Sequence, residues 1–374
     1  MNTVKNGNLI KAVAFFVIIA ILALTLVIVA NGWQDDTNEP DNSEADGDNT
    51  DTPTSGDADN DTPTTQQPPN QPPEPPEEPK VPMYLCPISG LETTEQISKS
   101  RPLVLTIDAN APLYGVSSAS MIIEVPIENG ATRSLLFTYE GEKLGKLGSI
   151  THTRDTLLDI VKDFTGISIS LGNDGHIQNN NEEYEGIDLG ENIGYHYTEY
   201  STFCYTNADL VKSMLKNLAV DRTLTTTAPF NFIGYFDKEI EGDLIASSIN
   251  INYGINNKTS FSYDIVSGEY TLSKNGLEVR DLLNDKKTTF DNLFILFANS
   301  ATYETDEYTE TVLDLNGGEG LYFTCGTAIK ISWTRSEDGT LEFIDELGNS
   351  LKVNRGRSYI SFVKASMKNS VEFS

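Results

Sequence analysis

The stretch MIIEVPIENGATRSLLFTY, residues 121–139, carries two strand patterns in close succession. Met121–Ile127 and Arg133–Tyr139 are rich in β-branched and aromatic residues, which strands favour. Similar runs at Arg101–Asp108 and Ile167–Leu171 predict two more strands. We therefore expect β-strands to form the framework of the first folded part of the chain.

Two amphipathic helices are expected among these strands. Asp155–Phe164 carries apolar side chains at helical spacing, and Thr153 is available as its N-cap. Ala208–Leu218 has the same character, with Thr206 or Asn207 as its cap. Its expected buried residues are Leu210, Val211, Met214, Leu215 and Leu218. The helices and strands together predict an α+β or α/β domain over residues 83–228.

Residues 229–374 are expected to form an all-β domain. Their alternating runs are separated by turn signals such as Asn275-Gly276 and Asp338-Gly339, which accept the positive φ values of tight hairpins. Turns at spacings of about 8–12 residues are typical of a meander, a sandwich or a partial barrel. The polar segment Leu224–Pro229 is the expected boundary between the two domains.

A membrane anchor is predicted near the N-terminus. Ala12–Ala30 contains no charged residue, and about 20 apolar residues are enough for a helix to cross a bilayer. A cleaved signal is the alternative, but its apolar region usually has only about 7–15 residues. Lys5 and Lys11 precede the run, which favours a cytoplasmic N-terminus at residues 1–11. We expect a retained single-pass helix at residues 12–31, with an extracellular ectodomain after it.

Residues 32–82 are expected to be a disordered linker. Residues 34–80 contain 14 Asp or Glu, one Lys and 10 of the 16 prolines of the chain. Such a segment cannot bury enough apolar surface to fold, and its charges and prolines favour extended conformations. The formal net charge of the whole chain is −29, which opposes nucleic-acid binding.

Cysteines and histidines offer no recognisable chemistry. Cys86, Cys204 and Cys325 are widely spaced and form no Cys-x-x-Cys motif; a Cys86–Cys204 bridge and three reduced thiols both stay open, with the thiols preferred. The three histidines lack the short spacing of zinc ligands. The sequence predicts no metal and no cofactor.

Charged residues in the first domain supply the candidate ligand-binding site. The candidates are Glu124, Glu128, Arg133, His152, Arg154 and Asp174. Glu124 and Glu128 would share one face of a continuous strand, where two carboxylates can do acid–base or glycosidic chemistry. The alternative is structural, with both glutamates paired to Arg133 and Arg154. A calcium site in the loops at Asn179–Glu183 and Asp188–Asn192 is a weaker hypothesis than a solvated acidic loop.

Three motifs of the chain resemble those of a known family. They are Pro87–Leu91 followed by Ile107–Asn110, the Glu-rich turn at Ile123–Arg133, and Asn354–Tyr359 near the end of the second domain. On these motifs the chain resembles the YerB-like family of bacterial extracytoplasmic proteins. Departures also occur, because Gly148–Arg154 keeps only one of two expected arginines. The resemblance implies an envelope protein of bacteria with thick walls, connected with wall assembly.

The features together predict a non-catalytic binding protein of the cell envelope, with no catalytic residue. Its expected partner is an envelope protein or a cell-wall polymer. One alternative is a wall-glycan hydrolase or transferase that uses Glu124 and Glu128. A second alternative is a small-ligand receptor with a cleft in the first domain.

Overall fold

The computed structural model describes residues 80–175, 186–226, 229–336 and 339–374. The predicted anchor at residues 12–31 lies outside these residues, as does the linker up to residue 79. The predicted domain boundary also falls partly outside them, at residues 227–228. Over the described ranges, every helix is too short or too polar to span a membrane.

Helices are few. The α-helices are α2 (Glu95–Ser98), α3 (Asp155–Asp163) and α4 (Ala208–Asn217). Short 3₁₀ helices are η1 (Val116–Ser118), η2 (Glu128–Gly130), η3 (Ile193–Tyr195) and η4 (Ala365–Ser370).

Strands make up most of the regular structure. The first part, up to residue 226, has β1 (Leu103–Ile107), β2 (Met121–Pro126), β3 (Thr132–Thr138), β4 (Leu147–Ile150), β5 (Ile167–Ser170), β6 (Gly186–Asp188), β7 (Tyr197–Glu199) and β8 (Phe203–Thr206). The second part, from residue 229, has β9 (Asn231–Phe232), β10 (Leu244–Ile245), β11 (Ser248–Gly254), β12 (Asn257–Asp264), β13 (Glu269–Lys274), β14 (Leu277–Glu278), β15 (Arg280–Asp281), β16 (Lys286–Lys287), β17 (Thr289–Phe290), β18 (Asn292–Ala298), β19 (Ser300–Glu304), β20 (Thr309–Leu313), β21 (Gly317–Thr324), β22 (Thr327–Arg335), β23 (Leu341–Asp345), β24 (Lys352–Val353), β25 (Ser358–Lys364) and β26 (Val371–Phe373).

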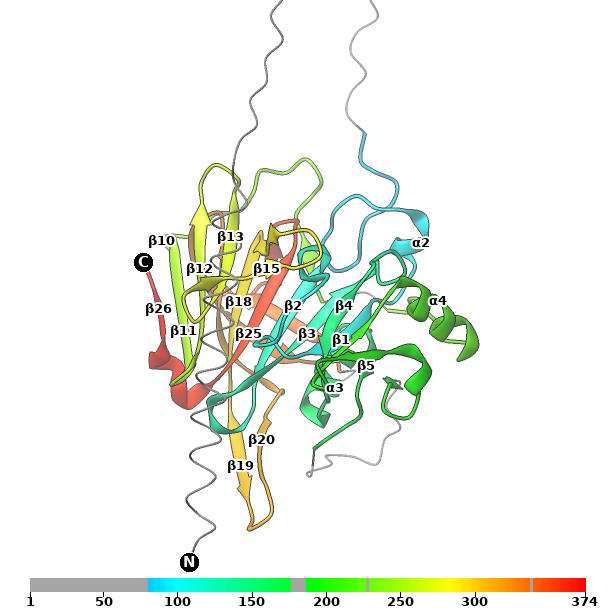
Figure 1. The fold of residues 1–374 in the computed structure, drawn as a ribbon. Coiled ribbons are helices and arrows are strands. Elements are labelled where there is room, and N and C mark those ends of the chain that lie inside the picture. Colours follow the sequence, from blue (N-terminus) through cyan, green and yellow to red (C-terminus); the bar gives the residue numbers. More distant parts are fainter. Residues whose placement is uncertain (1–79, 176–185, 227–228, 337–338) are drawn as a thin grey trace, which may run out of the picture. The chain divides into compact units, whose positions relative to one another are not determined.

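One sheet of 14 strands runs through both parts of the chain (Figure 1). Its central path is β10-β22-β21-β18-β25-β2-β3-β1-β4-β8-β7. The two parts join where β25 pairs in parallel with β2 on one side and with β18 on the other. Glu124 on β2 lies opposite Ser361 in this register. The hydrogen-bonded backbone therefore continues from one part into the other.

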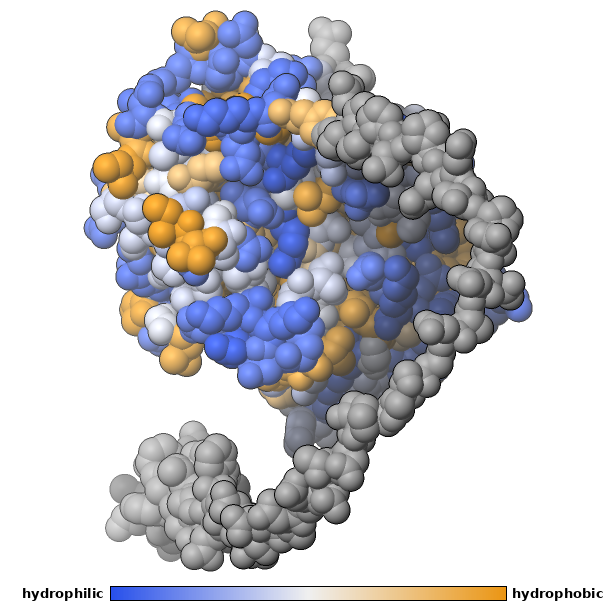
Figure 2. All heavy atoms as spheres, turned by 90° about the horizontal axis from the view of Figure 1, so that it is seen from above, coloured by the Kyte–Doolittle hydropathy of each residue, from blue (hydrophilic) through white to orange (hydrophobic). Residues whose placement is uncertain are grey.

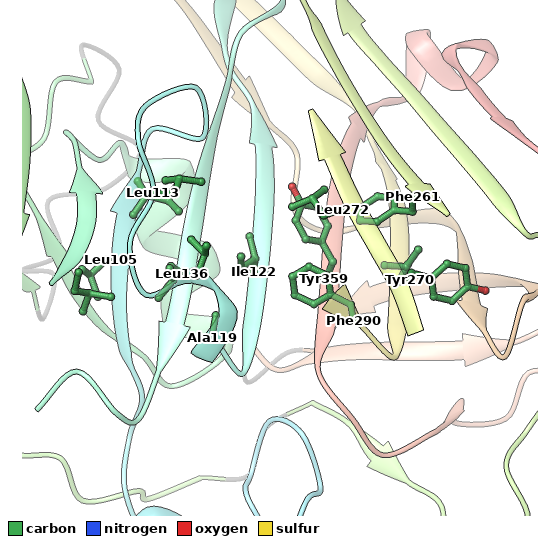
Figure 3. Packing of buried hydrophobic residues seen from close by; sticks show 14 of the residues in the cluster. Leu105, Leu113, Ala119, Ile122, Leu136, Phe261, Tyr270, Leu272, Phe290 and Tyr359 are labelled. Atoms are coloured by element: carbon green, nitrogen blue, oxygen red, sulfur yellow. The ribbon is translucent and has the colours of Figure 1, made fainter. Parts of the chain in front are cut away.

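The central strands β1, β2, β18 and β25 are buried on both faces, and they accordingly read as nearly continuous apolar runs. Residues alternate between two core clusters: Leu105, Ile122 and Tyr359 lie in one, and Ile123 and Ile360 in the other. Figure 3 shows the first cluster, in which Leu136 and Ile122 from the first part lie near Leu272, Phe290 and Tyr359 from the second part.

A second sheet covers the face that carries the first cluster. It has six strands, in the order β14-β13-β12-β11-β26, with β17 paired to β13. Phe261 on β12 and Phe290 on β17 both make edge-to-face contacts with Tyr359. Two sheets thus pack over one another as a sandwich, but one of them contains strands from both parts, whereas the turn spacing predicted a sandwich only as one option within the second part.

The coarse prediction of mostly strands, with a few helices, in two parts is confirmed. Among the described residues, the α-helices all lie in the first part. The turn at Asn275-Gly276 has positive φ at both residues, as predicted. The predicted helices α3 and α4 both form, and Asn207 caps α4 by accepting the N–H groups of Asp209 and Leu210.

Two details of the helix predictions were wrong. The cap of α3 is Arg154 and not Thr153, because the carbonyl of Arg154 accepts the N–H groups that begin the helix. In α4, Val211 and Met214 are fully buried, but Leu218 is 39% exposed because it stands at the end of the helix. The buried stripe of α4 is narrower than its apolar sequence suggested.

An ion pair between Asp163 on α3 and Arg335 on β22 links the two parts and gives a pH-dependent prediction. Burial raises the pKa of the Asp163 carboxyl from 3.8 to about 6, against the opposing charge of Arg335. Between these two pKa values the folded state holds a proton on Asp163 that the unfolded state releases. Binding of this proton stabilises the folded chain, and the stabilisation is fully present below about pH 4. It is lost as the pH rises through about 6.

We expect Asp163→Asn to remove this pH dependence. Between about pH 4 and pH 7, the stability of the variant should rise relative to the parent by about 2–3 kcal/mol. Urea unfolding at both pH values measures the two free energies. A stability difference that stays constant with pH would contradict the assignment.

Candidate functional site

Four of the predicted site residues form one chain of alternating charges in the first part. Arg154 makes a bidentate contact with Glu128, at 2.6 and 2.8 Å, and its Nε donates to Asp174 at 3.1 Å. Arg133 makes a second bidentate contact with Asp174, with both distances 2.6 Å. Sequence reasoning named all four residues and expected Glu128 to pair with Arg133 or Arg154, but it did not pair Asp174 with either arginine.

Backbone contacts bring these side chains together from distant segments. Thr153 donates its N–H to the carbonyl of Gly172, and Asp174 donates its N–H to the carbonyl of Thr153. The loop after β5 is thereby fixed against the start of α3. Gly130 closes the turn that carries Glu128, with φ of 74°, and a Cβ there would lie 2.8 Å from the carbonyl oxygen of Tyr253.

The charge network is mostly enclosed. The Arg154 side chain is 9% exposed and that of Asp174 is 35% exposed. Burial by itself raises the pKa of the Asp174 carboxyl, but hydrogen bonds from Arg133 and the charges of Arg133 and Arg154 outweigh it, so the net pKa is lowered. Asp174 is thus held as a carboxylate between two guanidinium groups, which leaves it poorly suited to accept a proton in catalysis.

Two further charged residues of the second part lie beside this network. Burial lowers the pKa of the Lys364 ammonium, while the nearby charge of Glu128 opposes that effect. Glu310 on β20 is buried, and its Oε1 would lie 3.1 Å from a Cβ placed on Gly175. Sequence reasoning missed both residues, because nothing local shows that β20 and β25 pass next to the first part.

Glu124 is separated from the network and fully buried between the two sheets. Its carboxylate is paired with the ammonium of Lys274 from β13. It also accepts hydrogen bonds from Thr132 at 2.8 Å, Thr259 at 2.7 Å and Tyr359 at 3.0 Å. The carboxylate therefore has partners from both parts of the chain.

The prediction that Glu124 and Glu128 share one face of a continuous strand was wrong. Strand β2 ends at Pro126, and Glu128 belongs to the following 3₁₀ turn. Glu124 pairs with Lys274, whereas Glu128 pairs with Arg154, so the two carboxylates share no partner. The pairing of glutamates with arginines holds for Glu128 only.

The sequence pattern around Lys274, the partner of Glu124, indicates that this lysine faces the core. Tyr270, Leu272 and Lys274 alternate along β13 and all three are buried, so Lys274 lies on the core face of its strand. A lysine at such a position needs a buried anion. Alternation therefore pointed to Lys274 as a charged core residue, although it could not name Glu124.

His152 and the cysteines take no part in these ion pairs. His152 is exposed and makes no hydrogen bond or ion pair within the described residues. Cys86 and Cys204 are free thiols in different core clusters, and Cys325 is free and half-buried. Over the described residues, no group of three or more His, Cys, Asp or Glu is placed to hold a metal ion.

The opening and closing sequence motifs meet at the junction of the two parts. Arg355 donates to the carbonyl of Gly90 at 2.8 Å, and Gly356 donates its N–H to the carbonyl of Ser89 at 2.8 Å. Arg357 donates to the carbonyl of Ala119 at 2.8 Å. Residues 354–359 therefore act as a structural clamp.

The loop before β2 is held from the second part as well. Asp281, which is fully buried, accepts hydrogen bonds from the N–H groups of Gly115 and Ser117, each at 2.9 Å. The same carboxylate accepts the Ser117 hydroxyl at 2.6 Å. It thus caps η1 across the junction.

Comparisons with known proteins identify the family. A family described as "Protein of unknown function (DUF3048) N-terminal domain" matches residues 88–220, and its C-terminal counterpart matches residues 249–360. The chain belongs to the DUF3048 family. The clamp at residues 354–359 and the Glu128–Arg154 pair accordingly lie within, or at the edge of, the segments that the family shares.

The crystal structure of the YerB protein from Bacillus subtilis has a similar fold. Its TM-score with this chain is 0.67 at 21% sequence identity. The match covers 78% of this chain and 99% of the YerB chain. This confirms the predicted resemblance to the YerB-like family at the level of the fold. No curated protein matches the chain.

Proposed function

We propose that this chain is a membrane-anchored, non-catalytic binding protein of the bacterial cell envelope, linked to wall assembly. The apolar run at residues 12–31 would anchor it, with its N-terminus in the cytoplasm, and the acidic residues 32–82 would hold the α/β and β-rich parts outside the membrane. Its partner would be an envelope protein or a wall polymer, and nucleic acid is disfavoured by the charge of −29.

One observation supports binding most strongly, an open groove in the second part with a volume of about 930 Å³. Strands β18, β21, β22 and β23 form one side, and η4 and β26 form the other. The lining residues are Phe297, Glu319, Gly320, Leu321, Lys330, Ile331, Ser332, Ile344, Asp345, Glu346, Gly348, Lys368, Asn369, Val371 and Phe373. The volume of the groove falls within the range of about 300–1,000 Å³ that is usual for sites of small ligands, so a short wall fragment would fit.

The lining of the groove combines apolar area with charges of both signs. Lys368 is paired with Glu319 and lies over the ring of Phe297, with its Nζ 5.4 Å from the ring centroid. Lys330 is exposed and has no side-chain partner within the described residues. Peptide-bearing wall fragments carry amines and carboxylates beside apolar groups, so their chemistry complements this lining.

One face of the molecule is mainly polar. Figure 2 shows hydrophobic residues as small separate groups among hydrophilic ones on the face seen from above. Isolated exposed apolar residues of this kind are usual on proteins in contact with water. Such a surface supports a hydrated setting for the folded part of the chain.

The two alternatives receive less support. A wall-glycan hydrolase would need Glu124 and Glu128 together beside a ligand, but Glu124 is fully buried and the two side chains have separate partners. A small-ligand receptor in the first part would use the charge network, whose arginines and carboxylates already satisfy one another. The groove of the second part remains the better binding site.

Binding of muropeptides to the full-length chain in detergent tests the proposal. Lys330→Glu would place a third uncompensated negative charge beside Asp345 and Glu346, so we expect its affinity to fall about tenfold, or about 1.4 kcal/mol. Lys286→Glu is the matched control, because Lys286 is also an exposed strand lysine without a side-chain partner in the described part. Equal affinity of both variants, or no binding by the parent, would rule the groove out.

A further inference from the structure

A hairpin that contributes no residue to the groove offers a second interaction surface. Strands β19 and β20 pair only with each other, and the hairpin projects from the end of β18 (Figure 1). All five residues of β19 are exposed, whereas Glu310, Thr311 and Leu313 of β20 are buried. One strand is thus packed against the molecule while the other faces solvent.

The buried strand is fixed next to the charge network. Lys364 donates to the hydroxyl of Thr311 at 3.1 Å, and β20 contacts the 3₁₀ turn η2 that carries Glu128. Glu310 lies close to Gly175 in the loop that holds Asp174. These contacts hold β20 in place and so present β19 as a preformed edge.

The free edge of β19 has a defined set of backbone groups. At the two ends of the hairpin, Asp314 donates its N–H to the carbonyl of Asn299, and Thr305 donates to the carbonyl of Tyr308. Hydrogen-bonded pairs alternate in an antiparallel ladder, so odd-numbered residues of β19 bond to β20. The N–H and C=O groups of Ser300, Thr302 and Glu304 therefore point away from β20, and no backbone partner meets them among the described residues.

The negative charge of the hairpin indicates which class of partner its free edge binds. Residues 299–313 contain Glu304, Asp306, Glu307 and Glu310 and no lysine or arginine. The first three are exposed. A second copy of a chain with net charge −29 would be repelled, whereas a basic segment would be attracted to this edge.

We propose that the edge of β19 binds an extended, basic polypeptide segment by strand addition. The three outward backbone pairs would continue the ladder, and the acidic tip would contact basic side chains of the partner. The edge and the groove share no residue, so the two proposals can be tested separately.

The test uses a labelled ten-residue peptide of alternating lysine and valine, measured by anisotropy against the full-length chain in detergent. Thr302→Pro removes one outward N–H without removing a bond to β20, and Thr302→Ala keeps that N–H as the matched control. We expect Thr302→Ala to bind like the parent and Thr302→Pro to bind at least tenfold more weakly. An alternating glutamate–valine peptide should not bind.

Hydrogen exchange on the parent chain provides a readout that does not depend on the proline variant folding. The basic peptide should slow exchange at residues 300–304 and leave residues 309–313 unchanged. Unaltered exchange at residues 300–304, equal binding by both Thr302 variants, or binding of the acidic peptide would overturn the proposal. So would concentration-dependent dimerisation that Thr302→Pro abolishes, because the occupant would then be a second copy.

Discussion

Replacement of Lys274 by methionine is expected to destabilise the folded chain by about 3–5 kcal/mol. The ammonium of Lys274 is the only cation paired with Glu124 in the described part of the chain, and Glu124 is fully buried. Methionine fills a similar volume but leaves a carboxylate between two sheets with only the hydroxyls of Thr132, Thr259 and Tyr359. An unpaired buried charge is far more costly than a missing surface contact.

Urea unfolding of the full-length chain measures this effect, with Lys286→Met as the exposed control. The control should change the free energy of unfolding by less than about 0.5 kcal/mol. The double replacement Glu124→Gln with Lys274→Met should recover part of the loss, because it removes both charges together. A loss below about 1 kcal/mol in the single Lys274 variant would contradict the role of this pair at the junction.

Replacement of Arg154 by methionine is expected to cost about 2–3 kcal/mol at pH 7. It removes the bidentate contact with Glu128 and one of the two cations at Asp174. Breaking a buried pair typically costs about 3–5 kcal/mol, and the partial exposure of Asp174 reduces that figure. The backbone carbonyl of Arg154 still begins α3 in the variant, so the helix itself is retained.

The loss should depend on pH in a defined direction. The net pKa of the Asp174 carboxyl is lowered in the folded state, so its stabilising contribution is present above the unfolded pKa and is lost as the pH falls through the folded value. The difference between Arg154→Met and the parent should therefore shrink at about pH 3. Arg280→Met is the control, since Arg280 also has two acidic partners but is 41% exposed. An equal loss in both variants would show that burial of the network has no effect.

Local elements could be predicted from the sequence because local patterns determine them. Strand β2 was expected at Met121–Ile127 and ends one residue earlier, and α4 was expected at Ala208–Leu218 and also ends one residue earlier. Apolar periodicity and a capping asparagine were sufficient for these. The path of the shared sheet was not predictable, because β25 pairs with β2 across more than 200 residues.

For the candidate site too, local features could be predicted from the sequence, whereas long-range contacts could not. Acidic and basic residues near strand ends could be named, and Glu128, Arg133, Arg154 and Asp174 do meet. The position of Glu124 could not be predicted as a core position, because its environment is made by β12 and β13 of the second part. Its distance in sequence from Lys274 leaves no local pattern that joins them.

The most direct test of whether this protein binds without catalysis is the mass of muropeptides recovered after binding to the full-length chain. Fragments recovered after prolonged incubation, and compared by mass spectrometry with untreated ones, should have unchanged masses, and Lys330→Glu should retain fewer of them. Cleaved or transferred fragments from the parent would show instead that the protein is an enzyme.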